Sequence, residues 1–142
     1  MDSVAAISMF LFQLCGWNAT DYAGDVVHAA KRYNLDPRIL VSMMWQESRC
    51  KPDATGKLGE LGLMQLKRDT WALSGYNHLS DEELRAPALN IMLGARHLRR
   101  CLKKCSGAIA GALGLYSGLS MRKGTCRESN YSRDILARLA ES

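Results

Sequence analysis

The first thirty residues contain no lysine or arginine, and Lys31 is the first such side chain. The apolar opening MDSVAAISMFLFQLCGW therefore lacks the basic start of a secretion signal, and it carries the acidic Asp2 instead. Its apolar run is also shorter than the roughly 20 residues that cross a bilayer. We expect residues 1–20 to form an apolar N-terminal helix packed on the core. An unusual or truncated signal is the alternative, and the sequence leaves the export route open.

No stretch of four to eight residues alternates convincingly between apolar and polar residues, the pattern of a half-buried strand. Internal repeats and low-complexity linkers are absent as well, and 142 residues is the usual size of one domain. Apolar residues recur instead at helical spacing between start and stop signals. We predict an all-α single domain over residues 1–142 with little or no β structure, apart from a brief turn within 53–63. The longest helix should lie near 86–105, and a short one is expected at 63–73.

Aromatic residues are missing from the densest basic cluster, HLRRCLKK at 97–104, and no RNA-binding signature occurs. Nucleic acid is therefore a weak candidate partner. The net charge of +5 favours anionic partners such as acidic wall polymers or membrane surfaces, although a solvated helix face explains the cluster more simply.

Cysteine, in contrast, is abundant. The chain contains five cysteines, which in a short sequence indicate an oxidising compartment: Cys15, Cys50, Cys101, Cys105 and Cys126. Cys101 and Cys105 lie one turn apart on a predicted helix, and Cys126 lies in a loop that can fold back. We predict a disulfide from Cys126 to Cys101 or Cys105, with at least one cysteine left free or paired between molecules. Structural zinc is the weaker rival, because His97 and Cys105 would lie roughly 12 Å apart along the helix.

Glu47 occupies an unexpected place on the apolar stripe of a helix. Asp36 and Pro37 supply an N-cap and a first-turn proline, and the stripe then follows at i, i+3, i+4 and i+7: Leu40, Met43, Met44 and Glu47. Burial and the negative end of the helix dipole both favour the protonated carboxyl there. That is the state of a general acid. A one-residue error in register would instead turn Glu47 toward water beside Gln46.

Three segments of the chain, ESRCKPDATGKLGELGLMQL, GALGLYSG and RESNYSRDIL, carry four ordered motifs. They resemble those of the lytic transglycosylase family, the goose-lysozyme-like enzymes that cleave peptidoglycan with a single lysozyme-like helical domain. ESRCKPDATGKLGELGLMQL resembles the first two motifs, with these residues in register: Glu47, Ser48, Pro52, Ala54, Gly59, Gly62, Leu63, Met64 and Gln65. GALGLYSG resembles the Ala-Tyr-Asn-x-Gly segment, with Tyr116 and Gly118 kept and Ser117 replacing asparagine. RESNYSRDIL resembles the closing Glu-Thr-x-x-Tyr motif and places Tyr131 on its tyrosine. The resemblance covers roughly residues 21–140.

The resemblance implies a lytic cleavage of the β-1,4 bond between N-acetylmuramic acid and N-acetylglucosamine that forms a 1,6-anhydro ring. Glu47 would act as the single general acid and base, and Tyr131 would orient its carboxyl or the N-acetyl group. The substrate-binding candidates are Ser48, Thr55, Met64, Gln65 and Tyr116, with Met64 and Gln65 on the groove floor and Tyr116 in its wall. No cofactor or metal is implied. We expect a monomer in the periplasm or cell wall, acting on glycan strands and delivered by a secretion or phage apparatus.

Two departures from the family pattern bear on the site. Gly56 stands where the family usually has a serine, nine residues after the glutamate, and Thr55 is the candidate substitute. Glu60 replaces a usually small residue, and we interpret it as a solvated loop side chain. Acidic residues that serve water in goose lysozymes are missing at Gly56 and Lys67, which favours transglycosylation over hydrolysis. A hydrolytic muramidase and a non-catalytic wall-binding or assembly protein remain the alternatives.

Overall fold

The computed structural model describes residues 3–117 and 125–141. Within them the chain forms α-helices and two 3-10 helices in this order: α1 Val4–Cys15, η1 Trp17–Tyr22, α2 Ala23–Tyr33, α3 Pro37–Ser48, η2 Trp71–Leu73, α4 Asp81–Arg85, α5 Pro87–Lys104, α6 Ile109–Tyr116 and α7 Asn130–Ala140. The only β pairings in the described residues are isolated bridges that join Leu61 to Thr55 and to Leu66. The predicted all-α class is confirmed. Gly118, a motif residue of the sequence analysis, lies outside the described residues.

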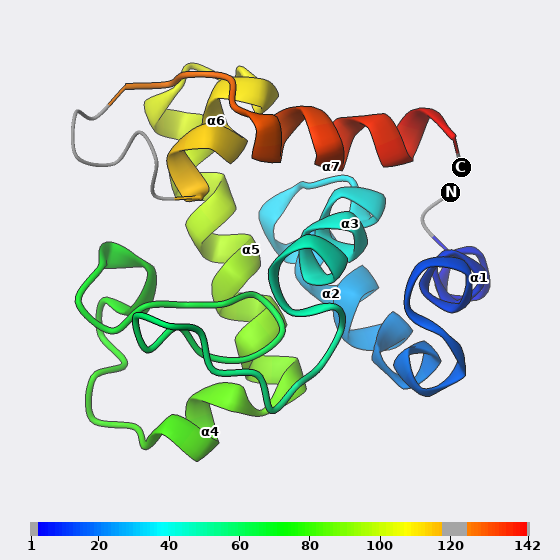
Figure 1. The fold of residues 1–142 in the computed structure, drawn as a ribbon, viewed down its shortest axis with the longest axis horizontal. Coiled ribbons are helices and arrows are strands. Elements are labelled where there is room, and N and C mark those ends of the chain that lie inside the picture. The colour runs from blue at the N-terminus through cyan, green and yellow to red at the C-terminus, as the bar shows by residue number, and fades with distance from the viewer. Residues whose placement is uncertain (1–2, 118–124, 142) are drawn as a thin grey trace.

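The longest helix, α5, forms the spine of the molecule and packs against both α2 and α6 (Figure 1). Its predicted position is confirmed, and its inward positions Ile91 and Leu98 are fully buried. Helix α4 begins with a capping box, because Ser80 accepts from the Glu83 amide while the Glu83 carboxyl accepts from the Ser80 amide.

Helix α3 begins as its local signals predict. The Asp36 carboxyl accepts from the Arg38 amide at 2.9 Å, and Pro37 occupies the first turn. The apolar stripe of α3 is fully buried at Leu40, Met43 and Met44. The helix ends when Arg49 adopts a left-handed conformation with φ of 53°. These limits put Glu47 in the last turn, at the edge of the core.

Helix α2 begins at Ala23, directly after η1 and with no side-chain cap. The prediction of a short helix over residues 63–73 was wrong. The segment 63–73 is not a helix except for η2, because the backbone of Leu66 bonds that of Leu61 in both directions and Gln65 takes a positive φ of 49°. The two hydrogen bonds between Leu61 and Leu66 and the positive φ of Gln65 give this loop a conformation that is incompatible with a helix.

The small residues of α6 allow the chain before α7 to cross it closely. A Cβ added at Gly111 would lie 2.8 Å from the Cys126 carbonyl oxygen, and one at Gly114 would collide with the Arg127 carbonyl oxygen. The crossing places α7 against both α6 and α3, as Figure 1 shows.

Two disulfides join distant segments. Cys126 bonds Cys105, one of its two predicted partners, so that prediction is confirmed. The bond between Cys15 and Cys50 was not predicted, and it ties the end of α1 to the residue that follows the C-cap of α3. Cys101 is free and buried. Across residues 3–117 and 125–141, no helix combines the length and apolarity needed to cross a membrane.

Candidate active site

The centre of the candidate site is the pair formed by Glu47 of α3 and Tyr131 of α7. The Tyr131 hydroxyl donates to Glu47 Oε2 at 2.6 Å, although 84 positions separate the two residues. The packing of α7 on α3 makes this contact possible. The structure therefore joins the two residues that the sequence analysis proposed as catalytic.

The carboxyl of Glu47 has a pKa raised to about 7 from its ordinary 4.5. Burial is the largest cause, since it destabilises the anion, and the negative charge of Glu60 acts in the same direction. The Tyr131 hydrogen bond opposes both, because it stabilises the carboxylate. The sequence-based expectation of a proton retained near neutral pH agrees with this pKa.

Tyr116 packs against the ring of Tyr131. Their rings stack at an interplanar angle of 11° with centroids 6.5 Å apart. The Tyr116 hydroxyl donates to the Met64 carbonyl at 2.9 Å, and the residue is buried. Burial raises the pKa of both phenols well above the usual value, so each hydroxyl keeps its proton as a donor. Tyr116 thus lies in the wall behind the Tyr131 ring.

Two of the predicted substrate-binding residues face the protein interior. The Ser48 hydroxyl is buried within hydrogen-bonding distance of two carbonyls, those of Met44 at 3.0 Å and Leu63 at 2.9 Å. Met64 is fully buried with its side chain over Gly94, where an added Cβ would lie 2.6 Å from Met64 Cγ. These contacts tie the loop after α3 to the core, and we leave both residues out of the proposed sugar contacts.

Asn90 of α5 organises this loop, and the sequence analysis missed it. Its fully buried amide donates to the carbonyls of Leu61 and Leu84, and its oxygen accepts from the Met64 amide at 2.7 Å. Gly62 is required opposite it, because an added Cβ would lie 2.6 Å from Asn90 Nδ2. The signal that could have identified Asn90 in the sequence is the position of its carboxamide on the same helical face as Leu93 and His97.

Gln65 and Thr55 belong to the loop after α3, and hydrogen bonds orient both side chains. The Gln65 amide nitrogen donates best to the Gly62 carbonyl, at 2.9 Å, and it also lies near the carbonyls of Ala54 and Glu60. Its oxygen is therefore the atom left to meet a ligand. Thr55 is exposed, and its hydroxyl accepts from Arg85 Nη2 at 2.6 Å.

Glu60 is not the solvated loop side chain that the sequence suggested. It is half-buried, and its Oε1 accepts from the Leu58 amide at 2.8 Å. A Cβ built on Gly56 would lie 2.5 Å from that oxygen. The prediction failed because a loop side chain can turn inward where a neighbouring glycine leaves space.

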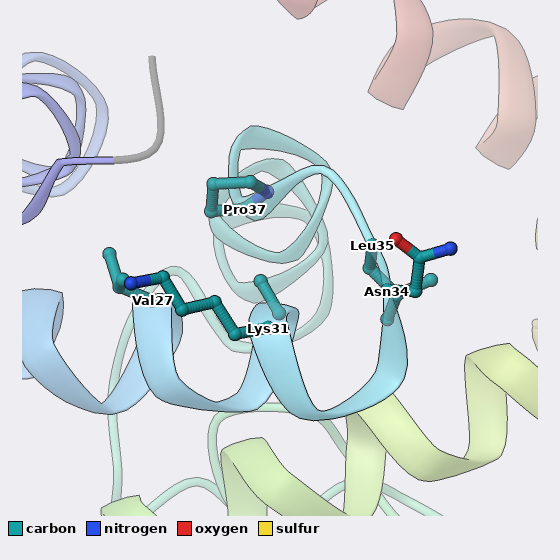
Figure 2. Close-up of a pocket in the computed structure, with 6 residues that line it drawn as sticks. Val27, Lys31, Asn34, Leu35 and Pro37 are labelled. Atoms are coloured by element: carbon teal, nitrogen blue, oxygen red, sulfur yellow. The ribbon is translucent and has the colours of Figure 1, made fainter.

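A shallow pocket lies elsewhere, between α2 and the start of α3 (Figure 2). Val27, Lys31 and Pro37 are among its lining residues. Pro37 and Glu47 stand ten residues apart on one helix, roughly 15 Å, so this pocket is separate from the candidate site. No group of three His, Cys, Asp or Glu side chains within residues 3–117 and 125–141 could hold a metal ion.

Comparison with known proteins identifies relatives that share this framework. A transglycosylase of Enterobacteria phage PRD1 is 29% identical over 108 residues, which cover 76% of this chain and 39% of that protein. The endo-type membrane-bound lytic murein transglycosylase A of Citrobacter koseri is 33% identical over 76 residues, 49% of this chain and 37% of the relative. Membrane-bound lytic murein transglycosylase F 1 of Alkalilimnicola ehrlichii is 34% identical over 76 residues, 54% of this chain and 14% of the relative.

The chain thus spans well under half the length of each of these three relatives. The family model described as the transglycosylase SLT domain matches residues 26–138, which include Glu47, Gln65, Tyr116 and Tyr131. The match runs from within α2 to the end of α7, while α1 lies outside it. The chain belongs to the transglycosylase SLT domain family.

Proposed function

We propose that this chain is a peptidoglycan lytic transglycosylase with Glu47 as its single general acid and base. The observation that carries the proposal is the Glu47 carboxyl itself. It is buried at the end of α3, and its pKa is raised to about 7. The Tyr131 hydroxyl of α7 donates a hydrogen bond to it at 2.6 Å. Near neutral pH such a carboxyl can both give and take a proton.

In the first step, protonated Glu47 donates its proton to the glycosidic oxygen between N-acetylmuramic acid C1 and N-acetylglucosamine O4. The C1–O4 bond breaks, and positive charge develops at C1 and the ring oxygen. The Glu47 carboxylate left behind stabilises that charge. The Tyr131 hydroxyl donates to Oε2 and so orients the carboxyl, with Oε1 left to reach the sugar.

In the second step, the C6 hydroxyl of the same muramic acid attacks C1 and closes the 1,6-anhydro ring. Its proton passes to the Glu47 carboxylate, which restores the acid for the next cycle. No water is consumed, so the products together have the same atoms as the substrate. The nucleophile belongs to the reacting sugar, and its high effective concentration replaces the activation of a water molecule.

Hydrolysis by a muramidase is the second candidate, and one observation favours it. The charge of Glu60 acts on the pKa of Glu47, so a second carboxyl lies within electrostatic range of the acid. Most glycosidases use two carboxyls, one of which activates water or attacks the sugar. The products separate the two reactions, since hydrolysis leaves a reducing end and adds one water.

The proposed substrate is the glycan strand of peptidoglycan, and the proposed place of action is the periplasm or cell wall, where this polymer lies. The two disulfides fit an oxidising compartment. The relatives include one phage protein and two bacterial membrane-bound proteins. We extend the proposal to a monomer that a phage or secretion apparatus delivers to the wall.

Digestion of purified sacculi, followed by mass analysis of the soluble muropeptides, tests the proposal. The wild type should release 1,6-anhydro products, and Glu47→Gln should release almost none while it keeps its fold. Glu82→Gln, which neutralises an exposed carboxyl on α4, is the matched control and should match the wild type. Reducing-end products would move the chain to the muramidases. Substantial cleavage by Glu47→Gln would overturn the acid–base assignment.

A further inference from the structure

Gly56 lies where two acceptor oxygens converge. A Cβ built on it would meet Glu60 Oε1 at 2.5 Å and Gln65 Oε1 at 2.7 Å, so both side chains border the space that a side chain at 56 would fill. The φ angle of Gly56 is not among the positive ones. A larger residue at this position would therefore clash with these side chains, whereas the backbone conformation would accept it.

The carboxylate of Glu60 is held in this place by its own loop. The Leu58 amide donates to Glu60 Oε1, and the Gly56 amide donates to the Glu60 carbonyl, both at 2.8 Å. One turn of backbone thus folds the side chain back over Gly56. An acceptor held by its loop binds a donor with less loss of side-chain freedom than a mobile one.

The Gln65 amide adds a second acceptor and no donor. Its nitrogen is committed to backbone carbonyls, the nearest being that of Gly62 at 2.9 Å, and no described residue donates to its oxygen. The place beside Gly56 therefore presents only acceptors, one of them charged. It suits N–H and O–H donors and rejects carbonyl oxygens.

The same place is within electrostatic range of the acid, because the charge of Glu60 contributes to the raised pKa of Glu47. Charged groups nearby include Lys57 beside Gly56 and Arg85 of α4, which bonds Thr55. A glycan strand bound at Glu47 is therefore the ligand that we expect to reach Glu60.

We propose that Glu60 is a specificity residue of the active site, which occupies the space left by Gly56 and accepts a hydrogen bond from an N–H or O–H group of the bound amino sugar. The inference rests on the proposed function, since it assumes an amino sugar at Glu47. It adds a substrate contact from a residue that the family motif does not supply. It also makes Gly56 and Glu60 an interdependent pair, because a side chain at 56 displaces the carboxylate.

A binding cycle in the inactive Glu47→Gln background tests the pair without turnover. The probe is a soluble tetramer of N-acetylglucosamine, and its dissociation constant is measured by calorimetry for four proteins: the Glu47→Gln parent, and that parent with Glu60→Ala, with Gly56→Ser, and with both changes. Glu60→Ala should weaken binding about tenfold, the size of one charge-assisted hydrogen bond. Gly56→Ser should weaken it similarly by displacing Glu60. The double variant should bind more tightly than either single one, because the serine hydroxyl then occupies free space and accepts the donor.

Two further variants sharpen the result. Glu60→Gln keeps an acceptor oxygen and should stay within about threefold of the parent, and Glu82→Ala removes an exposed carboxyl and should change nothing. Unchanged affinity in folded Glu60→Ala would overturn the proposal, because Glu60 would then only stabilise its loop. The proposal also fails if the fold-loss of affinity in the double variant equals the product of the fold-losses in the two single variants. Because the cycle measures binding, it can succeed even if sacculus digestion shows no lytic activity, so the two proposals fail separately.

Discussion

At the scale of the residue, the behaviour of Glu47 is a balance between opposing interactions. Burial and the charge of Glu60 raise its pKa, while the Tyr131 hydroxyl lowers it by stabilising the anion. The carboxyl keeps its proton near neutral pH because burial is the largest of these effects. The hydrogen bond of 2.6 Å from Tyr131 then orients the carboxyl, which still keeps its proton near neutral pH.

This balance has a cost in stability that depends on pH. The pKa of Glu47 is about 7 in the folded state and near 4.5 when exposed, so the folded state binds the proton more tightly. Stability is therefore lost as the pH rises from about 4.5 to above 7, where the fold must hold the buried anion, by roughly 3 kcal/mol in all. Glu47→Gln has no such proton. Chemical denaturation should show little difference between variant and wild type at pH 4.5 and a more stable variant at pH 8.5. A difference that does not change with pH would show that Glu47 is not protonated preferentially in the fold.

The Tyr131 hydroxyl is predicted to act on the reaction more than on the fold. Tyr131→Phe keeps the ring that stacks on Tyr116 and removes the donor to Glu47, so the free energy of unfolding should change by about 1 kcal/mol or less. Turnover should fall at least tenfold because the carboxyl loses its orientation. The pKa of Glu47 should rise, so the alkaline limb of the pH–rate profile should move to higher pH. A large fall in melting temperature with normal turnover would make the hydroxyl structural.

At the scale of the element, α1 packs against α3, the helix that carries Glu47, from outside the region that the family model matches. Helix α1 carries no charged residue in its first or last turn, and Ile7 and Leu11 bury its inner face. The Cys15–Cys50 disulfide links the last residue of α1 to Cys50, three residues after Glu47 and next to the C-cap of α3. The position of the last turn of α3 thus depends on an element that the family model does not include.

Removal of this bond should loosen α3 at its end. The paired change Cys15→Ser and Cys50→Ser opens a link of 35 positions, which in the chain-entropy account contributes about 3–4 kcal/mol to stability. Urea denaturation should show that loss, and glycan cleavage should fall with it. Cys101→Ala is the control, because it removes the free thiol without breaking a bond. Equal losses in the two proteins would mean that the disulfide has no special bracing role.

At the scale of the whole molecule, the charge of the chain is complementary to that of the proposed substrate. The chain carries a net charge of +5, and the stem peptides of peptidoglycan carry carboxylates. Long-range attraction of this kind increases association and is screened by salt, with a Debye length of about 10 Å at 0.1 M.

Binding to intact sacculi should therefore weaken as the salt concentration rises. The inactive Glu47→Gln protein allows the measurement by co-sedimentation, because it does not digest its target. The uncharged N-acetylglucosamine tetramer is the matched control, and its affinity should hardly change between 0.05 and 0.5 M salt, chosen to span roughly 14 to 4 Å of screening. Equal salt dependence for both ligands would remove the role of net charge in wall binding.

The sequence by itself determined most of the secondary structure and the identity of the central pair. Asp36 and Pro37 start α3, the spacing from Leu40 puts Glu47 on its inner face, and the family motifs point to Tyr131. Such signals depend on neighbours within a few positions, or on motifs that stay in order along the chain. That is why the helices and the pairing of Cys126 with a cysteine of α5 were predictable, while segment 63–73 was not.

Only the tertiary structure decided which motif residues face the site. Met64 and Ser48 turn inward because Gly94 leaves room for one side chain and the Leu63 carbonyl lies near the other, and neither partner is adjacent in sequence. Glu60 folds back over Gly56 because the glycine leaves space, and Asn90 accepts from the Met64 amide, 26 positions away in the sequence. The bond between Cys15 and Cys50 likewise depends on how α1 packs against α3. Side-chain direction at a site follows from the space and the unpaired groups that packing leaves, and those exist only once the helices are assembled.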